Sequence, residues 1–149
     1  MKNECINELQ FQIPSYSNNE SAARAIVSAF CAALNPTVDE ISDIRCAVSE
    51  AVTNCTVHAY RDMIGRISIS VRLYSDRSVK VQVRDRGCGI ENIEEALQPL
   101  FTTDPDGERS GMGFTVIENF MDSMSVRSTP GRGTCVTMKK KLTPLPIKK

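Results

Sequence analysis

The stretch ISISVRLYSDRSVKVQV, residues 67–83, decides how this chain folds. Apolar side chains occupy every second position through residues 67–73 and again through residues 79–83. A strict period of two is typical of strands that bury one face. Ser75 and Asp76 lie between the two runs and predict a turn, so we expect a β-hairpin with one buried face.

Two helices are expected before this hairpin. The first covers about residues 20–34 and ends at Asn35-Pro36, because a residue that precedes proline disfavours the helical conformation. The second begins at a cap provided by Thr37 or Asp39 and reaches about residue 58. Its apolar residues recur at helical spacing and predict a buried stripe that consists of Ile41, Ile44, Val48, Ala51, Val52 and Cys55.

Further strands are expected near both ends of the chain. An alternating run at residues 9–13 predicts a strand that Pro14 ends. Residues 123–128 and 134–140 predict a second hairpin, with the glycine-rich turn 130–133 between its strands.

The order of elements predicts the fold class. Short helices are also expected near residues 93–97 and 113–121, and residues 98–113 are expected to form a long loop. Hairpins and helices in this order indicate an α/β two-layer sandwich, with a mostly antiparallel sheet that carries helices on one face. We expect one domain over residues 1–142 and a disordered tail over residues 143–149.

Composition excludes some classes of function. The chain has 149 residues, of which 18 are Lys or Arg and 18 are Asp or Glu, so its charge gives no reason to expect a nucleic acid partner. No apolar stretch approaches the ~20 residues that span a bilayer, and the N-terminus has no secretory signal, so we expect a cytoplasmic protein without membrane contact. The six cysteines show no CxxC spacing, which argues against a zinc site and favours reduced thiols.

The first element with chemical potential is the pair Glu50 and Asn54. Residues four apart are neighbours on one helical face, and this face points away from the apolar stripe. The amide oxygen of asparagine suits Mg²⁺, and a glutamate can act as a general base toward a hydroxyl. The pair alone is also typical of a solvated helix face, which is the more frequent case.

The second element is Asp85-x-Gly87-x-Gly89, at the end of a predicted strand. A carboxylate there can accept a hydrogen bond from an exocyclic amine such as N6 of adenine. Glycines let the backbone approach a flat ring, because they carry no Cβ. The alternative is a plain Asp-Gly turn that leaves a strand.

The third element is the glycine-rich segment 107–113, which directly precedes a predicted helix. Free backbone amides at a helix N-terminus bind anions, and Arg109 could hold a phosphate by a charge-assisted hydrogen bond. No lysine follows the second glycine, so the segment is not a P-loop of the GxxxxGK[ST] type. The alternative is a flexible loop with a glycine-rich end.

Together and in this order, the three elements resemble the N box, G1 box and G2 box of the GHKL ATPase and kinase superfamily. Residues 49–55 correspond to the N box, 85–89 to the G1 box and 107–113 to the G2 box. Residues 131–134, Gly-Arg-Gly-Thr, match the last glycine element.

Further segments resemble the anti-sigma F factors of spore-forming bacteria. The resemblance extends from about residue 5 to 141, and its most discriminating segments are LFTT at 100–103 and SGMGF at 110–114. Ala59 departs from the glycine that this family often has after the histidine, which leaves the local helix end open. The matching segments, which include these two, are 19–24, 48–54, 98–103, 108–114 and 118–122.

The resemblance implies an ATP-dependent protein serine kinase that also binds a sigma factor. Such a protein, with nucleotide bound, holds sigma F away from RNA polymerase. It phosphorylates a serine of an anti-anti-sigma factor, and the unphosphorylated antagonist displaces the sigma factor. The resemblance also implies a homodimer without direct contact to nucleic acid.

The resemblance assigns roles residue by residue. Glu50 would be the base that takes the serine proton, and Asn54 would ligate Mg²⁺ that bridges the phosphates. Asp85 would recognise adenine, with Gly87 and Gly89 making room for the base. The other ATP-binding residues, several of them under a lid over about residues 99–111, would be Thr103, Arg109, Ser110, Gly111, Gly113 and Thr134.

Glu20 and Arg24 lie at the start of the first predicted helix, where the resemblance suggests a docking surface for the sigma factor or its antagonist. The alternative is a pair of solvated first-turn charges. His58 is the only histidine, and we expect a structural role for it at a helix end rather than phosphorylation.

Other functions remain as alternatives. A nucleotide-gated sigma-binding module without kinase activity would need the metal ligand but not Glu50. The catalytic domain of a sensor histidine kinase would need an additional phosphoacceptor helix pair, for which the chain has no room. A structural adaptor with degenerate boxes would not bind ATP, although all three boxes are intact.

Overall fold

The computed structural model describes residues 2–98 and 113–146. The expected lid and the end of the expected tail, residues 147–149, lie outside the described residues. The elements in chain order are β1 Cys5–Pro14, α1 Asn19–Cys31, a 3₁₀ turn Ala32–Leu34, α2 Val38–Asn54, a π-helical turn η2 Cys55–Ala59, β2 Arg66–Tyr74, β3 Ser78–Asp85, α3 Ile93–Ala96, α4 Gly113–Phe120, β4 Ser123–Thr129 and β5 Gly133–Lys141.

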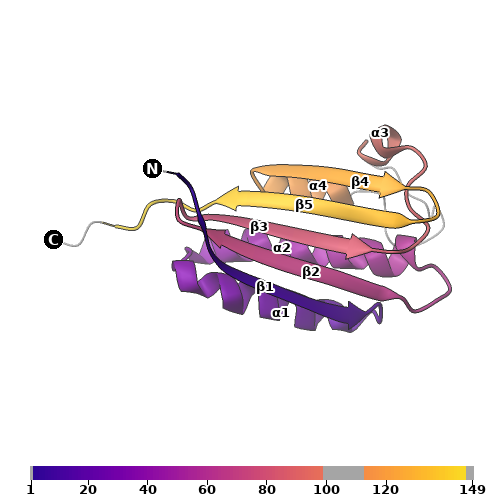
Figure 1. The fold of residues 1–149 in the computed structure, drawn as a ribbon, viewed down its shortest axis with the longest axis horizontal. Coiled ribbons are helices and arrows are strands. Elements are labelled where there is room, and N and C mark those ends of the chain that lie inside the picture. The colour runs from indigo at the N-terminus through magenta and orange to yellow at the C-terminus, as the bar shows by residue number, and fades with distance from the viewer. Residues whose placement is uncertain (1, 99–112, 147–149) are drawn as a thin grey trace.

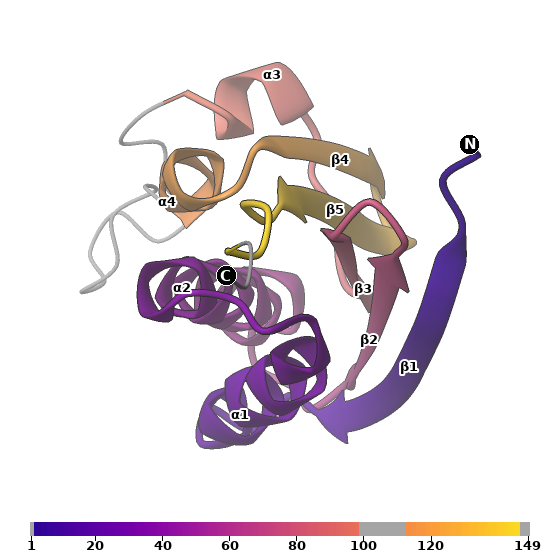
Figure 2. The ribbon, with the colours of Figure 1, turned by 90° about the vertical axis from the view of Figure 1, so that its left-hand side faces the viewer.

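The strands form one five-stranded sheet in the order β1-β2-β3-β5-β4, and neighbouring strands are antiparallel. Helices α1, α2 and α4 lie together on one side of this sheet, while α3 lies beside β4 (Figures 1 and 2). The expected α/β two-layer sandwich is therefore confirmed, including its mostly antiparallel sheet.

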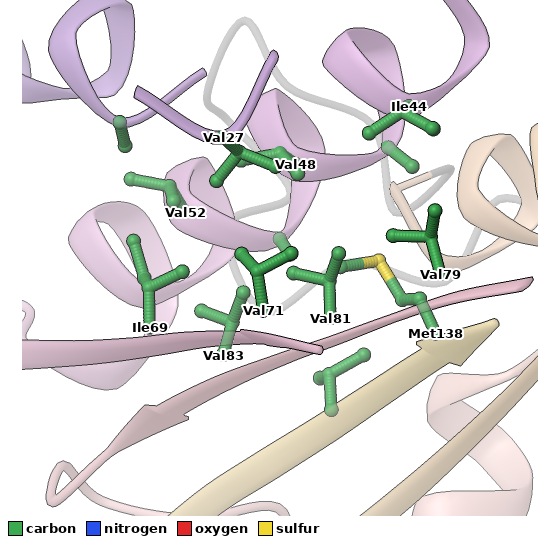
Figure 3. Packing of buried hydrophobic residues seen from close by; sticks show 14 of the residues in the cluster. Val27, Ile44, Val48, Val52, Ile69, Val71, Val79, Val81, Val83 and Met138 are labelled. Carbon is green, nitrogen blue, oxygen red and sulfur yellow. The ribbon is translucent and has the colours of Figure 1, made fainter. Parts of the chain in front are cut away.

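Alternation along the strands separates the two faces of the sheet. Ile69 pairs with Val83, and Val71 pairs with Val81, and all four side chains are buried beneath the helices. Figure 3 shows these residues packed against Val48 of α2 and its neighbours. The opposite face is polar: there the Arg72 guanidinium on β2 lies 2.8 Å from the Glu8 carboxylate on β1.

The predicted stripe of α2 faces the sheet as expected, with Ile41 half-buried and its other members buried. The helix begins at a capping box, in which Thr37 Oγ1 accepts a hydrogen bond from the Glu40 amide and the Glu40 carboxylate accepts one from the Thr37 amide. Of the two caps that the sequence allows, Thr37 is the one used.

Two helix ends differ from the sequence-based expectation. The first helix ends its α-helical part at Cys31 and continues as the 3₁₀ turn to Leu34, where Asn35 adopts a left-handed conformation with φ 50°. The second helix changes to π-helical hydrogen bonding at Cys55 and ends at Ala59. No helix in the described part of the chain is long and apolar enough to cross a membrane.

Candidate functional site

A cavity of about 1050 Å³ opens at the end of the sheet, between the last turns of α2, the end of β3 and the start of β5. Five residues proposed from the sequence line it, although they come from distant segments: Asn54, Asp85, Gly87, Gly89 and Thr134. Glu50 lies one turn before Asn54 on α2 and is half-buried, and the cavity lining includes Ala51 between them. The fold therefore brings the N box, the G1 box and the last glycine element to one place.

Asp85 is the buried acidic group of this cavity, with only 6% of its surface exposed. Its Oδ1 accepts hydrogen bonds from the Gly87 amide at 2.9 Å and the Thr134 amide at 3.2 Å, and its Oδ2 accepts one from the Cys55 thiol at 3.5 Å. Burial raises the pKa of this carboxyl, and the three hydrogen bonds oppose that effect in part. The result is a fixed acceptor at the base of the cavity.

Cys55 is the partner of Asp85 that sequence reasoning placed only in the apolar stripe. The side chain is 4% exposed and belongs to the core cluster. Burial raises the pKa of the thiol well above its usual value, and the nearby Asp85 charge raises it further, so the sulfur keeps its proton and acts as a donor.

The glycines of the G1 box are required by close packing. A Cβ on Gly87 would lie 2.3 Å from the carbonyl oxygen of Ala59. Gly89 has φ +75°, and a Cβ there would lie 2.4 Å from the carbonyl oxygen of Thr129. From the sequence we expect these glycines to make room for a ligand, and the structure shows that they first make room for the protein's own backbone.

The π-helical turn connects α2 to the G1 box. Its hydrogen bond runs from the Tyr60 amide to the Cys55 carbonyl at 3.1 Å, and the Ala59 carbonyl accepts a hydrogen bond from the Cys88 amide at 3.0 Å. Turns of this type occur frequently at functional sites. The sequence did not define how the helix ends at Ala59. The structure shows that it ends in this π-helical turn, which packs directly against the G1 box.

Two hydroxyl groups that sequence reasoning missed hold the walls of the cavity. Tyr60 donates to the Arg66 carbonyl and accepts from the Arg86 amide, both at 2.6 Å, and burial is the main cause that raises its pKa. Ser128 Oγ accepts from the Ile90 amide at 2.7 Å and lies 2.8 Å from Thr134 Oγ1. Neither residue follows a motif spacing, so the sequence carried no signal for them.

The candidate docking residues lie on α1 and pair with each other. Arg24 Nη1 is 3.3 Å from Glu20 Oε1, and the same oxygen accepts a hydrogen bond from the hydroxyl of Ser49 on α2. The side chain of Arg24 is 38% exposed, and that of Glu20 is 22% exposed. Glu20 therefore links Arg24 on the surface of α1 to Ser49 on α2, the residue directly before Glu50.

The remaining predicted residues are placed as follows. Gly113 is the first residue of α4. His58 lies in the π-helical turn and lines the cavity. The predicted residues Thr103, Arg109, Ser110 and Gly111 fall outside the described residues.

The side chains that line the cavity could bind a nucleotide together with a metal ion. The Asn54 side chain supplies an amide oxygen at the cavity, and Mg²⁺ usually takes one or two protein ligands together with water and substrate phosphates. The described residues contain no cluster of three or more His, Cys, Asp or Glu side chains that could cage a metal. An ion held by Asn54 could take its remaining ligands from water and from the phosphate oxygens of a nucleotide.

Comparison with known proteins identifies the class of domain to which this fold belongs. Residues 13–140 match the family model of the histidine kinase-like ATPase domain. The match runs from the end of β1 into β5, so the chain carries an ATPase domain of this class.

Curated relatives narrow the assignment. The anti-sigma F factor of Caldanaerobacter subterraneus subsp. tengcongensis is 53% identical over 134 residues, which cover 90% of this chain and 93% of the relative. The anti-sigma F factor of Geobacillus kaustophilus is 54% identical over 135 residues, covering 90% and 92%, and that of Priestia megaterium is 50% identical over 138 residues, covering 92% and 94%. The chain belongs to the anti-sigma F factor family, which confirms the resemblance drawn from its sequence.

Solved structures share the fold at low sequence identity. The RsbU and RsbW domains of a Mycobacterium tuberculosis protein match with a TM-score of 0.66 and 21% identity, covering 91% of this chain and 32% of that chain. The mycobacterial sensor histidine kinase MprB matches with a TM-score of 0.57 and 14% identity, covering 92% of this chain and all of that chain.

Proposed function

We propose that this protein binds and inhibits a sporulation sigma factor and uses ATP with Mg²⁺ to phosphorylate a serine of an anti-anti-sigma factor. The observation that carries the proposal is the convergence of Asn54, Asp85 and Thr134 on one cavity of about 1050 Å³. The names of the curated relatives support the sigma factor as a partner.

The base of the nucleotide would bind at Asp85. The carboxylate is buried and takes its hydrogen bonds from donors of the protein, so it offers only acceptor positions to a ligand. The exocyclic amine of adenine complements such a group, whereas the keto oxygen of guanine would face a second acceptor. Recognition at this end therefore favours ATP.

The phosphates would lie toward Asn54 on α2. Mg²⁺ supplies charge neutralisation for the phosphate oxygens when it is bound. The amide oxygen of Asn54 would hold the ion, and Arg109, Ser110, Gly111, Gly113 and Thr103 are proposed to contact the phosphates. Asp85 and Asn54 both line this cavity, which supports the proposed division of roles.

Glu50 would act as the general base for the transfer. The seryl oxygen of the substrate forms a bond to the γ-phosphorus, and the bond from that phosphorus to the leaving oxygen of the nucleoside diphosphate breaks. The seryl proton passes to the Glu50 carboxylate. Because phosphoryl transfer depends mainly on positioning and charge neutralisation, a carboxylate is a sufficient base.

The partners would dock beside the catalytic helix. Arg24 and Glu20 present their charged groups on α1, and Ser49 joins them to α2. We propose that this surface binds the sigma factor or its antagonist. We also propose a cytoplasmic homodimer, as the family resemblance implies.

The test is transfer of label from radioactive ATP, with Mg²⁺, to a candidate anti-anti-sigma protein. The Asn54→Ala variant is the critical comparison, and Asn119→Ala, which changes an exposed asparagine of α4, is the matched control. Label on a serine of the antagonist that is lost in N54A and kept in N119A supports the proposal. Normal ATP binding without any transfer would contradict it and favour a nucleotide-gated sigma-binding module.

A further inference from the structure

Cys55 occupies a distinctive position between the N box and the G1 box. It follows Asn54 directly and opens the π-helical turn, and its side chain is almost completely buried. Its thiol donates to Asp85 Oδ2 over 3.5 Å, and the residue also lines the cavity. The Cys55 side chain thus belongs to the core and also donates a hydrogen bond to Asp85, the candidate group for binding adenine.

The two oxygens of Asp85 are held in different ways. Oδ1 accepts hydrogen bonds from the amides of Gly87 and Thr134. In the part of the chain that the structure describes, the hydrogen bond to Oδ2 comes from the Cys55 thiol. Contacts at both oxygens fix the rotation of the carboxylate plane, whereas the two amides alone hold it at one oxygen.

We infer that Cys55 is a positioning residue for nucleotide recognition, whose S–H group turns the Asp85 carboxylate so that Oδ2 presents its second acceptor position to the exocyclic amine of adenine. The inference rests on the proposed role of Asp85 in binding the base. A carboxylate oxygen can accept two hydrogen bonds, so the thiol and the amine can share Oδ2.

The role of Cys55 can be separated from its contribution to packing. Serine keeps a donor at the same position, while alanine removes it. Cys31 provides a matched control, because it is a fully buried cysteine of α1 in the same core cluster and does not line the cavity. Loss of packing alone would affect C31A and C55A in the same way.

The experiment compares two nucleotides that differ only at the position in question. ATP carries the 6-amino group, and purine riboside 5′-triphosphate lacks it. Dissociation constants of both nucleotides are measured by calorimetry with Mg²⁺ for the parent protein and for C55A, C55S and C31A. Thermal unfolding establishes that each variant is folded, and Cys55→Val, which fills the space without a donor, replaces C55A if that variant does not fold.

The expected result is a change in the ratio of the two dissociation constants. The parent protein binds ATP more tightly than purine riboside 5′-triphosphate, and C55A reduces this preference about fivefold to tenfold by weakening ATP binding, as expected for a disturbed hydrogen bond to a charged acceptor. C55S and C31A keep the parental preference. A structural defect would instead weaken both nucleotides equally.

Two results would overturn the inference, and they are distinguishable. If the parent protein prefers ATP and C55A keeps that preference in full, Cys55 does not position the carboxylate, while the role of Asp85 stands. If the parent protein itself does not distinguish the two nucleotides, Asp85 does not contact the amine, and both the proposed base recognition and the role of Cys55 fail.

Discussion

The hydroxyl of Ser49 on α2 donates a hydrogen bond to the carboxylate of Glu20 on α1. The same carboxylate oxygen is 3.3 Å from Arg24, so one acceptor connects the exposed charge of α1 to the helix that carries the candidate base. Glu50 follows Ser49 directly. A partner that engages Arg24 would therefore contact a hydrogen-bond network that reaches the helix carrying Glu50.

Arg24→Ala is expected to abolish partner binding and to leave nucleotide binding unchanged. The side chain is 38% exposed on α1, and it does not line the cavity. An exposed ion pair contributes less than about 1 kcal/mol to stability, so the variant should also fold normally. Calorimetry with ATP and a pull-down with the sigma factor measure the two properties separately.

The control for this prediction is Arg127→Ala, which removes an exposed arginine from β4. R127A should bind sigma factor like the parent protein. Unchanged sigma and antagonist binding by R24A would show that Glu20 and Arg24 are a solvated ion pair and nothing more.

Glu50→Gln is expected to reduce phosphoryl transfer by about 10²–10⁴-fold, the usual contribution of a general base. ATP affinity should change little, because the carboxamide keeps the shape of the side chain and Asn54 is untouched. Single-turnover transfer from labelled ATP measures the chemical step, and calorimetry measures binding. Transfer at the parental rate would show that another group takes the serine proton.

The alternating runs at 67–73 and 79–83 were sufficient to predict the central hairpin, because the period of two directly reports which face is buried. The stripe of α2 was equally informative, since Ile44 and Val48 recur at helical spacing. The order of β5 and β4 in the sheet was not predictable. Both strands of that hairpin alternate in the same way, and only the structure shows that β5 pairs with β3.

The site was predictable only in part. Asn54, Asp85 and the glycines follow recognisable spacings, so their motifs could be assigned from the sequence. The contact between Cys55 and Asp85 depends on the fold bringing the turn after α2 against the end of β3, which no spacing reports. Tyr60 binds the Arg86 amide 26 residues away in the chain, so it too became visible only in the structure.

Gly87→Ala is expected to destabilise the protein by about 3 kcal/mol, the upper end of the usual cost of overpacking. The added Cβ would lie 2.3 Å from the Ala59 carbonyl oxygen, which is backbone and cannot rotate away. Gly131→Ala is the comparison, because Gly131 has φ +79° but open space around it, so strain alone should cost ~1 kcal/mol. Urea unfolding measures both values, and equal losses would contradict the packing argument.

Glu40 makes part of the stability dependent on pH. Burial raises the pKa of its carboxyl, but hydrogen bonds from Thr37 and Thr143 outweigh this effect and lower the pKa. A carboxyl whose pKa is lower in the folded state contributes stability above its unfolded value, and this contribution is lost as the pH falls through the folded value. The free energy of unfolding should therefore decrease below about pH 4.3, the value of an unperturbed glutamate.

Glu40→Gln should flatten this part of the pH profile. Urea unfolding at several pH values measures it, with Glu118→Gln, at an exposed position of α4, as the control that keeps the parental slope. A parental slope in E40Q would mean that another carboxyl is responsible. Thr37→Ala, which removes the helix cap itself, should cost about 1 kcal/mol near neutral pH.

If Asp85 binds the adenine amine as proposed, ATP affinity should also decrease as the pH falls, but the pKa of Asp85 is raised whereas that of Glu40 is lowered. Burial raises the pKa of the Asp85 carboxyl, and the hydrogen bonds from Gly87, Cys55 and Thr134 only partly oppose this effect. In the proposed recognition the ionised form is the acceptor for the adenine amine, so protonation should weaken the contact. ATP affinity should therefore fall at a higher pH than the value of about 3.9 for an ordinary aspartate would predict.

Dissociation constants of ATP and of purine riboside 5′-triphosphate between pH 5 and pH 8 test this prediction. The triphosphate groups of the two nucleotides titrate alike, so the ratio of the constants isolates the contact to the base. The preference for ATP should decrease toward the acidic end in the parent protein. Asp85→Asn should bind ATP at least about tenfold more weakly, because a hydrogen bond to a charged group is lost, and its preference should not vary with pH. A pH-dependent preference that persists in D85N would assign the titration to another group of the cavity.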